Sequence, residues 1–355
     1  MTYQLIIRIL LPTISAFVLG LATTPFFSFL FYRYRLWKRS SRIDEKNNPD
    51  MLTKGGREMS IVHNENETKT PRVGGIIIWF SIILVILLTE LSYFVWPEAH
   101  DLRFITRNQT LLILAALLAG AFLGLIDDFL QIFGNAKQLA IGIPRKVRIL
   151  SVLGLGLIQG WWFFDKLGYS AIALPFELGS LELGVFIVPF IVLTVLALFS
   201  SSVIDGIDGL AAGVLAIIFA TYGFIGVFQG QFSIAVFSFV VTGALLAFLW
   251  FNIPPARFYL GETGVLALTL PLAVTIFLTN TVLEFLVIGL PLVLTAGSSL
   301  VQIISRRFFD RKVLKLAPLH HHFEALGWSR EKITMRYWVF TAMCSAVGLV
   351  VVIAG

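Results

Sequence analysis

The sequence predicts an all-α, polytopic integral membrane protein with about ten transmembrane helices. The chain of 355 residues is 57% hydrophobic and 14% charged, whereas a soluble globular protein carries about 25% charged residues. Its mean hydropathy is +0.86. Apolar runs of about 20 residues, the length with which a helix crosses the hydrocarbon core, recur along the chain. We therefore expect residues 1–355 to form a single transmembrane domain.

Ten apolar runs define the expected helices. The first extends from about Leu5 to Phe31. No basic segment precedes it and it has no small-residue cleavage site, so we interpret it as a retained helix rather than a signal peptide. The fourth, sixth and seventh runs contain Gly or polar interruptions. The helices are expected near 5–32, 73–96, 110–130, 147–164, 184–203, 210–229, 233–251, 264–281, 284–304 and 336–354.

The basic residues predict the orientation. If the helices alternate in direction, five connecting segments share one side and hold 23 of the 27 Lys and Arg residues. Positive residues mark the cytoplasmic side, so we expect these segments to face the cytosol and both termini to lie outside. An odd number of missed helices would scramble this asymmetry, which favours an even count near ten. The segments are 33–72, 131–148, 204–209, 252–264 and 305–336.

Five carboxylates fall at predicted helix ends on the cytosolic side. Asp127 and Asp128 lie in "LGLIDDFLQ", Asp205 and Asp208 in "SSSVIDGIDGLAAG", and Glu262 in "FNIPPARFYLGETG". Helix ends attract acidic residues as caps and dipole partners. Five on one face of a membrane favour a functional site instead, because an ionisable residue there is costly unless it is solvated, paired or bound to a cation.

The residue types of this cluster indicate its chemistry. Carboxylate ligands without Cys favour Mg²⁺, with Mn²⁺ as the alternative, over Zn²⁺. Mg²⁺ takes one or two carboxylates and leaves its other positions to water and phosphate. With cytosolic Lys and Arg nearby, the cluster predicts a site for phosphoryl transfer on a phosphorylated substrate. The chain contains neither a Walker P-loop nor a GxGxxG motif, and we expect no nucleic-acid partner.

Three consecutive histidines, His320, His321 and His322, follow Pro318 in a basic segment. Their side chains cannot share one direction on a helix or strand, so a zinc site from this run alone is disfavoured. A solvated loop with incidental histidines is one interpretation. The better one is that they line a site for anionic groups, as hydrogen-bond donors or proton carriers near neutral pH.

Five motifs carry a resemblance to a known family. "TKTPRVGGI", "LGLIDDFL", "IDGIDGLA", "FNIPPARFYLGETG" and "APLHHHFEALGW" occur in this order. The chain thereby resembles the polyprenyl-phosphate N-acetylhexosamine-1-phosphate transferases, and its histidine segment is similar to that of the phospho-N-acetylmuramoyl-pentapeptide transferase subgroup. The resemblance implies Mg²⁺-dependent transfer from UDP-N-acetylmuramoyl-pentapeptide to undecaprenyl phosphate in the bacterial inner membrane, with UMP and lipid I as products of this step of peptidoglycan synthesis.

The resemblance also implies roles for individual residues. One paired aspartate is expected to act as a base or to orient the lipid phosphate. The uridine is expected near Gly206, Asn252 and Tyr259, with Tyr259 stacking. The expected catalytic residues are Asp127, Asp128, Asp208 and His320. The expected metal ligands are Glu262, Asp128 and Asp205. The expected substrate-binding residues are Gly206, Asn252, Tyr259, His321, His322, Lys146 and Ser202.

Three residues depart from the family pattern. Glu262 stands where the family has Asp, Ser202 where it has Asn, and Gln131 where a Lys is common, although Lys146 remains downstream. These departures leave two alternatives open: a relative that transfers GlcNAc-1-phosphate to undecaprenyl phosphate, and a catalytically weak paralogue that serves as a scaffold. A transporter is disfavoured, because transporters hold their key polar residues near the bilayer midplane.

A glycine pair bears on helix packing. Gly120 and Gly124 form a GxxxG motif in the third apolar run. Such a motif allows two helices to approach closely. We expect it to serve packing between helices, with a homodimer as the second expectation.

Overall fold

The structure is a computed structural model that describes residues 3–38, 68–95, 102–106, 109–134, 142–176 and 178–355. Most of the expected segment 33–72, and residues 135–141 of the segment 131–148, therefore lie outside the described residues. The helices are α1 (Tyr3–Arg33), α3 (Gly75–Val95), α4 (Thr110–Phe133), α5 (Arg145–Trp161), α6 (Ile187–Ser200), α7 (Leu210–Phe228), α8 (Phe232–Asn252), α9 (Gly261–Leu278), α10 (Phe285–Ile288), α11 (Leu290–Phe309), α12 (Leu319–Ala325) and α13 (Arg330–Ala354).

The predicted all-α class is confirmed. Strands β1 (Ala171–Ala173) and β2 (Ser180–Glu182) form one short antiparallel hairpin. Within the described residues, nine helical segments are long and apolar enough to cross a membrane. They coincide with nine of the ten expected runs. The run expected at 284–304 is instead divided between α10 and α11, because Gly289 separates them and Pro291 stands in the first turn of α11.

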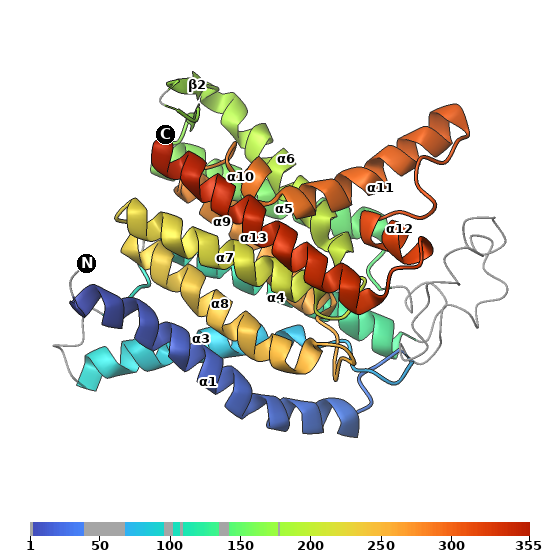
Figure 1. Ribbon diagram of the computed structural model, residues 1–355. Coiled ribbons are helices and arrows are strands. Elements are labelled where there is room, and N and C mark those ends of the chain that lie inside the picture. Colours follow the sequence, from blue (N-terminus) through green and yellow to red (C-terminus); the bar gives the residue numbers. More distant parts are fainter. Residues whose placement is uncertain (1–2, 39–67, 96–101, 107–108, 135–141, 177) are drawn as a thin grey trace.

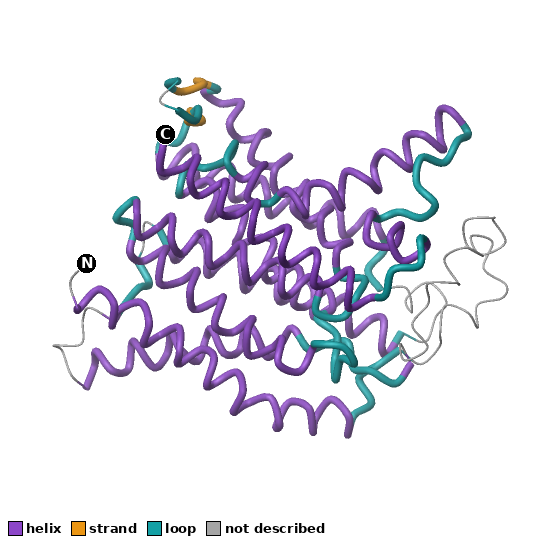
Figure 2. Tube along the Cα trace, viewed as in Figure 1, coloured by secondary structure: helices purple, strands orange, loops and turns teal. Residues whose placement is uncertain are grey.

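The helices run back and forth between two ends of the bundle. Figure 1 shows that α1 begins and α13 ends at the same end. The loop after α8 and the helix α12 lie at the opposite end, where Figure 2 shows a concentration of loops. A chain that starts and finishes at one end makes an even number of crossings. Among the described residues, α10 and α11 occupy the place of the tenth expected run. Which membrane side each end faces stays a prediction.

The core of the bundle is formed by α7, α8 and α9, which are buried along most of their lengths. The outer helices α1, α5 and α13 expose most of their apolar surface, as expected for helices that face lipid, where every backbone polar group is satisfied within the helix.

The GxxxG motif packs α4 against α9. A Cβ added to Gly120 would lie 2.2 Å from the Leu266 carbonyl oxygen, and one added to Gly124 would lie 2.2 Å from the Glu262 carbonyl oxygen. Only glycine therefore permits this approach of the two backbones. The expectation that the motif serves helix packing is confirmed within the chain. The expectation of a homodimer stays a prediction.

Candidate active site

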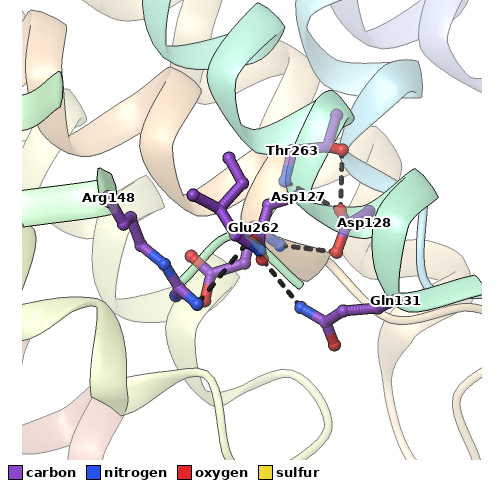
Figure 3. Close-up of polar contacts among 7 residues, drawn as sticks. Asp127, Asp128, Gln131, Arg148, Glu262 and Thr263 are labelled. Atoms are coloured by element: carbon purple, nitrogen blue, oxygen red, sulfur yellow. Dashed lines mark hydrogen bonds and ion pairs between the residues drawn. The ribbon is translucent and has the colours of Figure 1, made fainter. Parts of the chain in front are cut away.

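Asp128 links the end of α4 to the start of α9. Its Oδ2 accepts hydrogen bonds from the N–H of Thr263 at 2.9 Å and from the Thr263 hydroxyl at 2.7 Å, and its Oδ1 accepts from the N–H of Glu262 at 3.3 Å (Figure 3). The first N–H groups of a helix have no partner within the helix. Asp128 supplies that partner from another helix, and the carboxylate is fully buried. Its position is therefore fixed by the packing of α4 on α9.

Asp127 is equally buried but points to different partners. Its Oδ1 accepts from the N–H of Ile143 at 2.7 Å, and its Oδ2 accepts from the side-chain amide of Gln131 at 2.7 Å (Figure 3). The Arg148 guanidinium lies 3.5 Å from the same Oδ1. Adjacent residues on a helix point about 100° apart, and the two aspartates accordingly make separate contacts.

Glu262 faces Arg148 from the first turn of α9. Its Oε1 accepts a hydrogen bond from the Arg148 guanidinium at 2.8 Å (Figure 3). Within the described part of the chain, its Oε2 is buried and has no hydrogen-bond partner. A buried carboxylate oxygen without a partner is unfavourable, so this atom is available to a cation.

Asp205 interacts electrostatically with Glu262 and Asp128. Although the residue is exposed to solvent, desolvation by nearby protein atoms raises the pKa of Asp205 to about 7, with Arg72 opposing the shift and Glu262 and Asp128 adding to it. A cation bound among these acids would offset their mutual repulsion and favour their ionised forms.

The three expected metal ligands are thus electrostatic neighbours, but they do not form a closed cage. Among the described residues, no group of three or more His, Cys, Asp or Glu side chains is arranged to hold a metal ion. Mg²⁺ typically takes one or two carboxylates and completes its shell with water and phosphate. The unpartnered oxygen of Glu262 beside Asp205 fits such an open site.

Asp208 and Asn252 hold two loops together. Asp208 Oδ2 accepts the N–H of Ala256 at 3.1 Å. The buried Asn252 amide accepts the N–H of Gly209 at 3.0 Å and donates to the carbonyl of Phe258 at 2.9 Å. Burial raises the pKa of Asp208, against the hydrogen bond from Ala256. The structure therefore gives Asn252 a clear structural role, while its expected contact with substrate stays a prediction.

The histidine run lies within the short helix α12, and this helix contacts the segment 204–209. A Cβ added to Gly206 would lie 2.6 Å from His320 Nε2 and 3.0 Å from His321 Nε2. His320 is fully buried, and burial, followed by the neighbouring His321, lowers the pKa of His320 well below its usual value. His322 faces elsewhere, since its Nδ1 accepts the N–H of Lys315 at 3.2 Å.

The remaining expected substrate-binding residues lie nearby in the fold. Ser202 belongs to the 3₁₀ turn that precedes Asp205, and Lys146 is exposed in the first turn of α5. Tyr259 is half-buried, and its backbone N–H donates to the carbonyl of Pro71 at 2.8 Å. Their contacts with substrate stay predictions.

Sequence reasoning missed four residues that complete the site. Arg72 lies within electrostatic range of Asp128 and Asp205. The other three are Arg148, Thr263 and Glu324. Arg72, Thr263 and Glu324 lie inside quoted motifs, so the motifs themselves were the available signal. Arg148 lies in none, and its contacts depend on how the start of α5 is placed near Asp127 of α4 and Glu262 of α9.

Replacement of Arg148 by Met is expected to lower both the melting temperature and the turnover. It would leave Glu262 and Asp127 without their shared cation, and loss of one partner from a partly buried ion pair is destabilising, here by about 1–2 kcal/mol because the pair is partly solvated. Thermal unfolding in detergent measures the effect. The exposed Arg145, one turn earlier on α5, supplies the control Arg145→Met, and equal melting temperatures for the two variants would contradict the expectation.

Comparisons with known proteins identify the family of the chain. Residues 110–280 match the model of glycosyl transferase family 4. A phospho-N-acetylmuramoyl-pentapeptide-transferase of Caldanaerobacter subterraneus is 33% identical over 77% of this chain and 81% of its own length. Proteins of the same name from a Thermoanaerobacter species and from Levilactobacillus brevis are each 30% identical, over 94% and 98% of this chain and over 95% and 99% of their own lengths. The chain belongs to glycosyl transferase family 4 and, within it, to the phospho-N-acetylmuramoyl-pentapeptide-transferase family.

Proposed function

We propose that this protein transfers phospho-N-acetylmuramoyl-pentapeptide from its UDP derivative to undecaprenyl phosphate, giving UMP and lipid I for peptidoglycan synthesis. In this reaction an oxygen of the lipid phosphate attacks the phosphorus that carries the sugar, and the bond from that phosphorus to UMP breaks. The observation that carries the proposal is the meeting of buried acids from α4 and α9 with the segment 204–209 and α12 at one end of the bundle. Membership of the family supports the substrates.

The residues of the site have distinct roles in the proposed reaction. Asp128 is held rigidly by three hydrogen bonds and supplies fixed negative charge. Arg72 and Arg148 place positive charge beside the acids and favour the approach of a diphosphate. A lipid phosphate is already anionic near neutral pH, so the attack does not require a base. His320 is neutral and faces the segment 204–209, where it can donate one hydrogen bond to a substrate oxygen.

The proposed cofactor is Mg²⁺, with Mn²⁺ as a substitute. Glu262, Asp205 and Asp128 would hold it, and the buried Oε2 of Glu262 without a protein partner supports this choice. When bound, the ion would neutralise charge that develops on the phosphate oxygens.

The proposed location is the bacterial inner membrane, with this end of the bundle in the cytosol and both termini outside. The distribution of Lys and Arg supports this orientation, and the relatives are bacterial. The position of the acids at one end of the helices, rather than midway along them, supports an enzyme over a transporter.

The test is UMP release by purified protein in detergent. We expect release with undecaprenyl phosphate, UDP-N-acetylmuramoyl-pentapeptide and Mg²⁺, loss of release with EDTA, and recovery with added Mg²⁺ or Mn²⁺. UMP release with UDP-GlcNAc but not with UDP-N-acetylmuramoyl-pentapeptide would show that the protein transfers GlcNAc-1-phosphate instead. If folded protein releases no UMP with either sugar nucleotide, a non-catalytic scaffold would be favoured. Activity that EDTA leaves unchanged would remove the cation from the proposal.

A further inference from the structure

The three consecutive histidines occupy three different environments. Among the described residues, neither ring nitrogen of His320 has a hydrogen-bond partner. His322 is bound to the backbone of Lys315. His321 differs from both, because its Nδ1 lies 2.9 Å from Oε2 of Glu324. The rings of His320 and His321 are close, with centroids 4.3 Å apart.

We propose that Glu324 is a positioning residue that fixes the orientation and the tautomer of His321 over the segment 204–209. This inference rests on the proposed function, in which that segment forms part of the substrate site. It assigns to Glu324 an effect exerted through His321 rather than by contact with substrate.

The geometry holds the Glu324 carboxylate from two sides. His321 and Glu324 are three residues apart and therefore share one face of α12. The other oxygen of Glu324, Oε1, accepts a hydrogen bond from Nε of Arg330 at 2.7 Å, at the first position of α13. All three side chains are mostly buried, with 19%, 13% and 31% of their surfaces exposed for His321, Glu324 and Arg330. The two oxygens of the Glu324 carboxylate are thus held by His321 on one side and by Arg330 on the other.

The charge state of Glu324 fits this role. An acid near the C-terminus of a helix is disfavoured by the helix dipole, and Arg330 offsets that cost. Burial acts to raise the pKa of Glu324, but the hydrogen bonds from His321 and Arg330 outweigh it and lower the pKa. Glu324 is therefore an anion at neutral pH, and it can accept a hydrogen bond from an N–H at Nδ1 of His321.

The consequence falls on the opposite nitrogen of His321. With Nδ1 protonated toward Glu324, Nε2 is directed at Gly206, 3.0 Å from the place that a Cβ would take. A neutral ring then offers a lone pair at Nε2, and a protonated ring offers an N–H there. The lone pair can accept a hydrogen bond from a hydroxyl group of the sugar nucleotide, and the N–H can donate one to a phosphate oxygen. A carboxylate that fixes the tautomer of a functional histidine in this way is a recurring device.

The first experiment observes the tautomer directly. Protein with ¹⁵N-labelled histidine in nanodiscs is compared with the Glu324→Ala and Glu324→Gln variants, and loss of one signal in a His321→Gln variant assigns the resonance. We expect the Nδ1–H form of His321 in the wild type and a shift toward the Nε2–H form in Glu324→Ala, with His320 and His322 unchanged. An unchanged His321 signal in Glu324→Ala would overturn the proposal.

The second experiment measures UMP release. We expect kcat to fall roughly 10–100-fold in Glu324→Ala, by analogy with the loss of carboxylate partners of metal-binding histidines, while KM changes less than about threefold. The control is Glu90→Ala, which breaks a Glu–Arg pair with Arg103 of equal 2.7 Å length on another helix and is expected to leave kcat within about twofold. A lowered melting temperature with wild-type kcat would indicate a purely structural carboxylate and overturn the proposal.

The two readouts separate this inference from the proposed function. If the wild-type protein releases no UMP, the proposed function fails, whereas the tautomer measurement still decides whether Glu324 orients His321.

Discussion

Replacement of Asp128 by Asn is expected to reduce UMP release by about 100–1,000-fold, the scale seen when one preorganised electrostatic group is removed from an active site. The amide removes a negative charge beside Glu262 and Asp205. In the wild type, the carboxylate accepts hydrogen bonds from two N–H groups and from the Thr263 hydroxyl. The amide of Asn would turn its NH₂ group toward at least one of these donors. Leaving such a buried donor unsatisfied costs about 1–3 kcal/mol.

Two further variants separate the loss of charge from the loss of the helix cap. Thr263→Val keeps the Asp128 carboxylate and removes one hydrogen bond, so we expect lowered stability with most of the turnover retained. Asp310→Asn is the matched control, because Asp310 is exposed and its φ of +48° is a backbone conformation that Asn tolerates. Turnover above one tenth of wild type in Asp128→Asn would contradict the assignment of Asp128 as a charge that the reaction needs.

Replacement of Gly124 by Ala is expected to destabilise the protein strongly and to lower turnover with it. The new Cβ would lie 2.2 Å from the carbonyl oxygen and 2.4 Å from the carbonyl carbon of Glu262. Neither is the movable end of a side chain, so α4 and α9 must separate. Overpacking of a well-packed core costs about 1–3 kcal/mol or more. Because Glu262 and Asp128 lie at this junction, the separation also displaces the site.

The matched control for this variant is Gly154→Ala on α5. A Cβ at Gly154 would meet no atom within 4 Å, and Ala is a better helix former than Gly, so we expect an equal or higher melting temperature. Melting temperatures measured in detergent decide between the two sites. Equal values for Gly124→Ala and Gly154→Ala would show that the contact of α4 with α9 is not as tight as described.

The span positions could be predicted because each span requires a long apolar run, and nine such runs became helices. The division at Gly289 could not be predicted with the same rule, since hydropathy does not register a change of helix direction. The charge asymmetry predicted an even number of crossings, and the positions of both chain ends agree with it.

The acids of the site could be predicted from their placement at helix ends, but their partners could not. Asp127 and Asp128 are adjacent in sequence, yet one binds the N–H of Ile143 and the other caps α9. That difference depends on the direction of each side chain and on the register of α4 against α9. The role of Arg148 could not be predicted either, because its partner Glu262 lies 114 positions further along the chain.

The shared location of the two chain ends has a practical consequence for labelling. Because α1 begins and α13 ends at the end of the bundle away from α12 (Figure 1), a reporter fused to either end should report the same compartment and stay clear of the histidine segment. A pair of complementary fragments of a split fluorescent protein, one at each end, should therefore reassemble within a single molecule. A donor and an acceptor dye attached to the two chain ends would allow the distance between the ends to be measured by energy transfer during turnover.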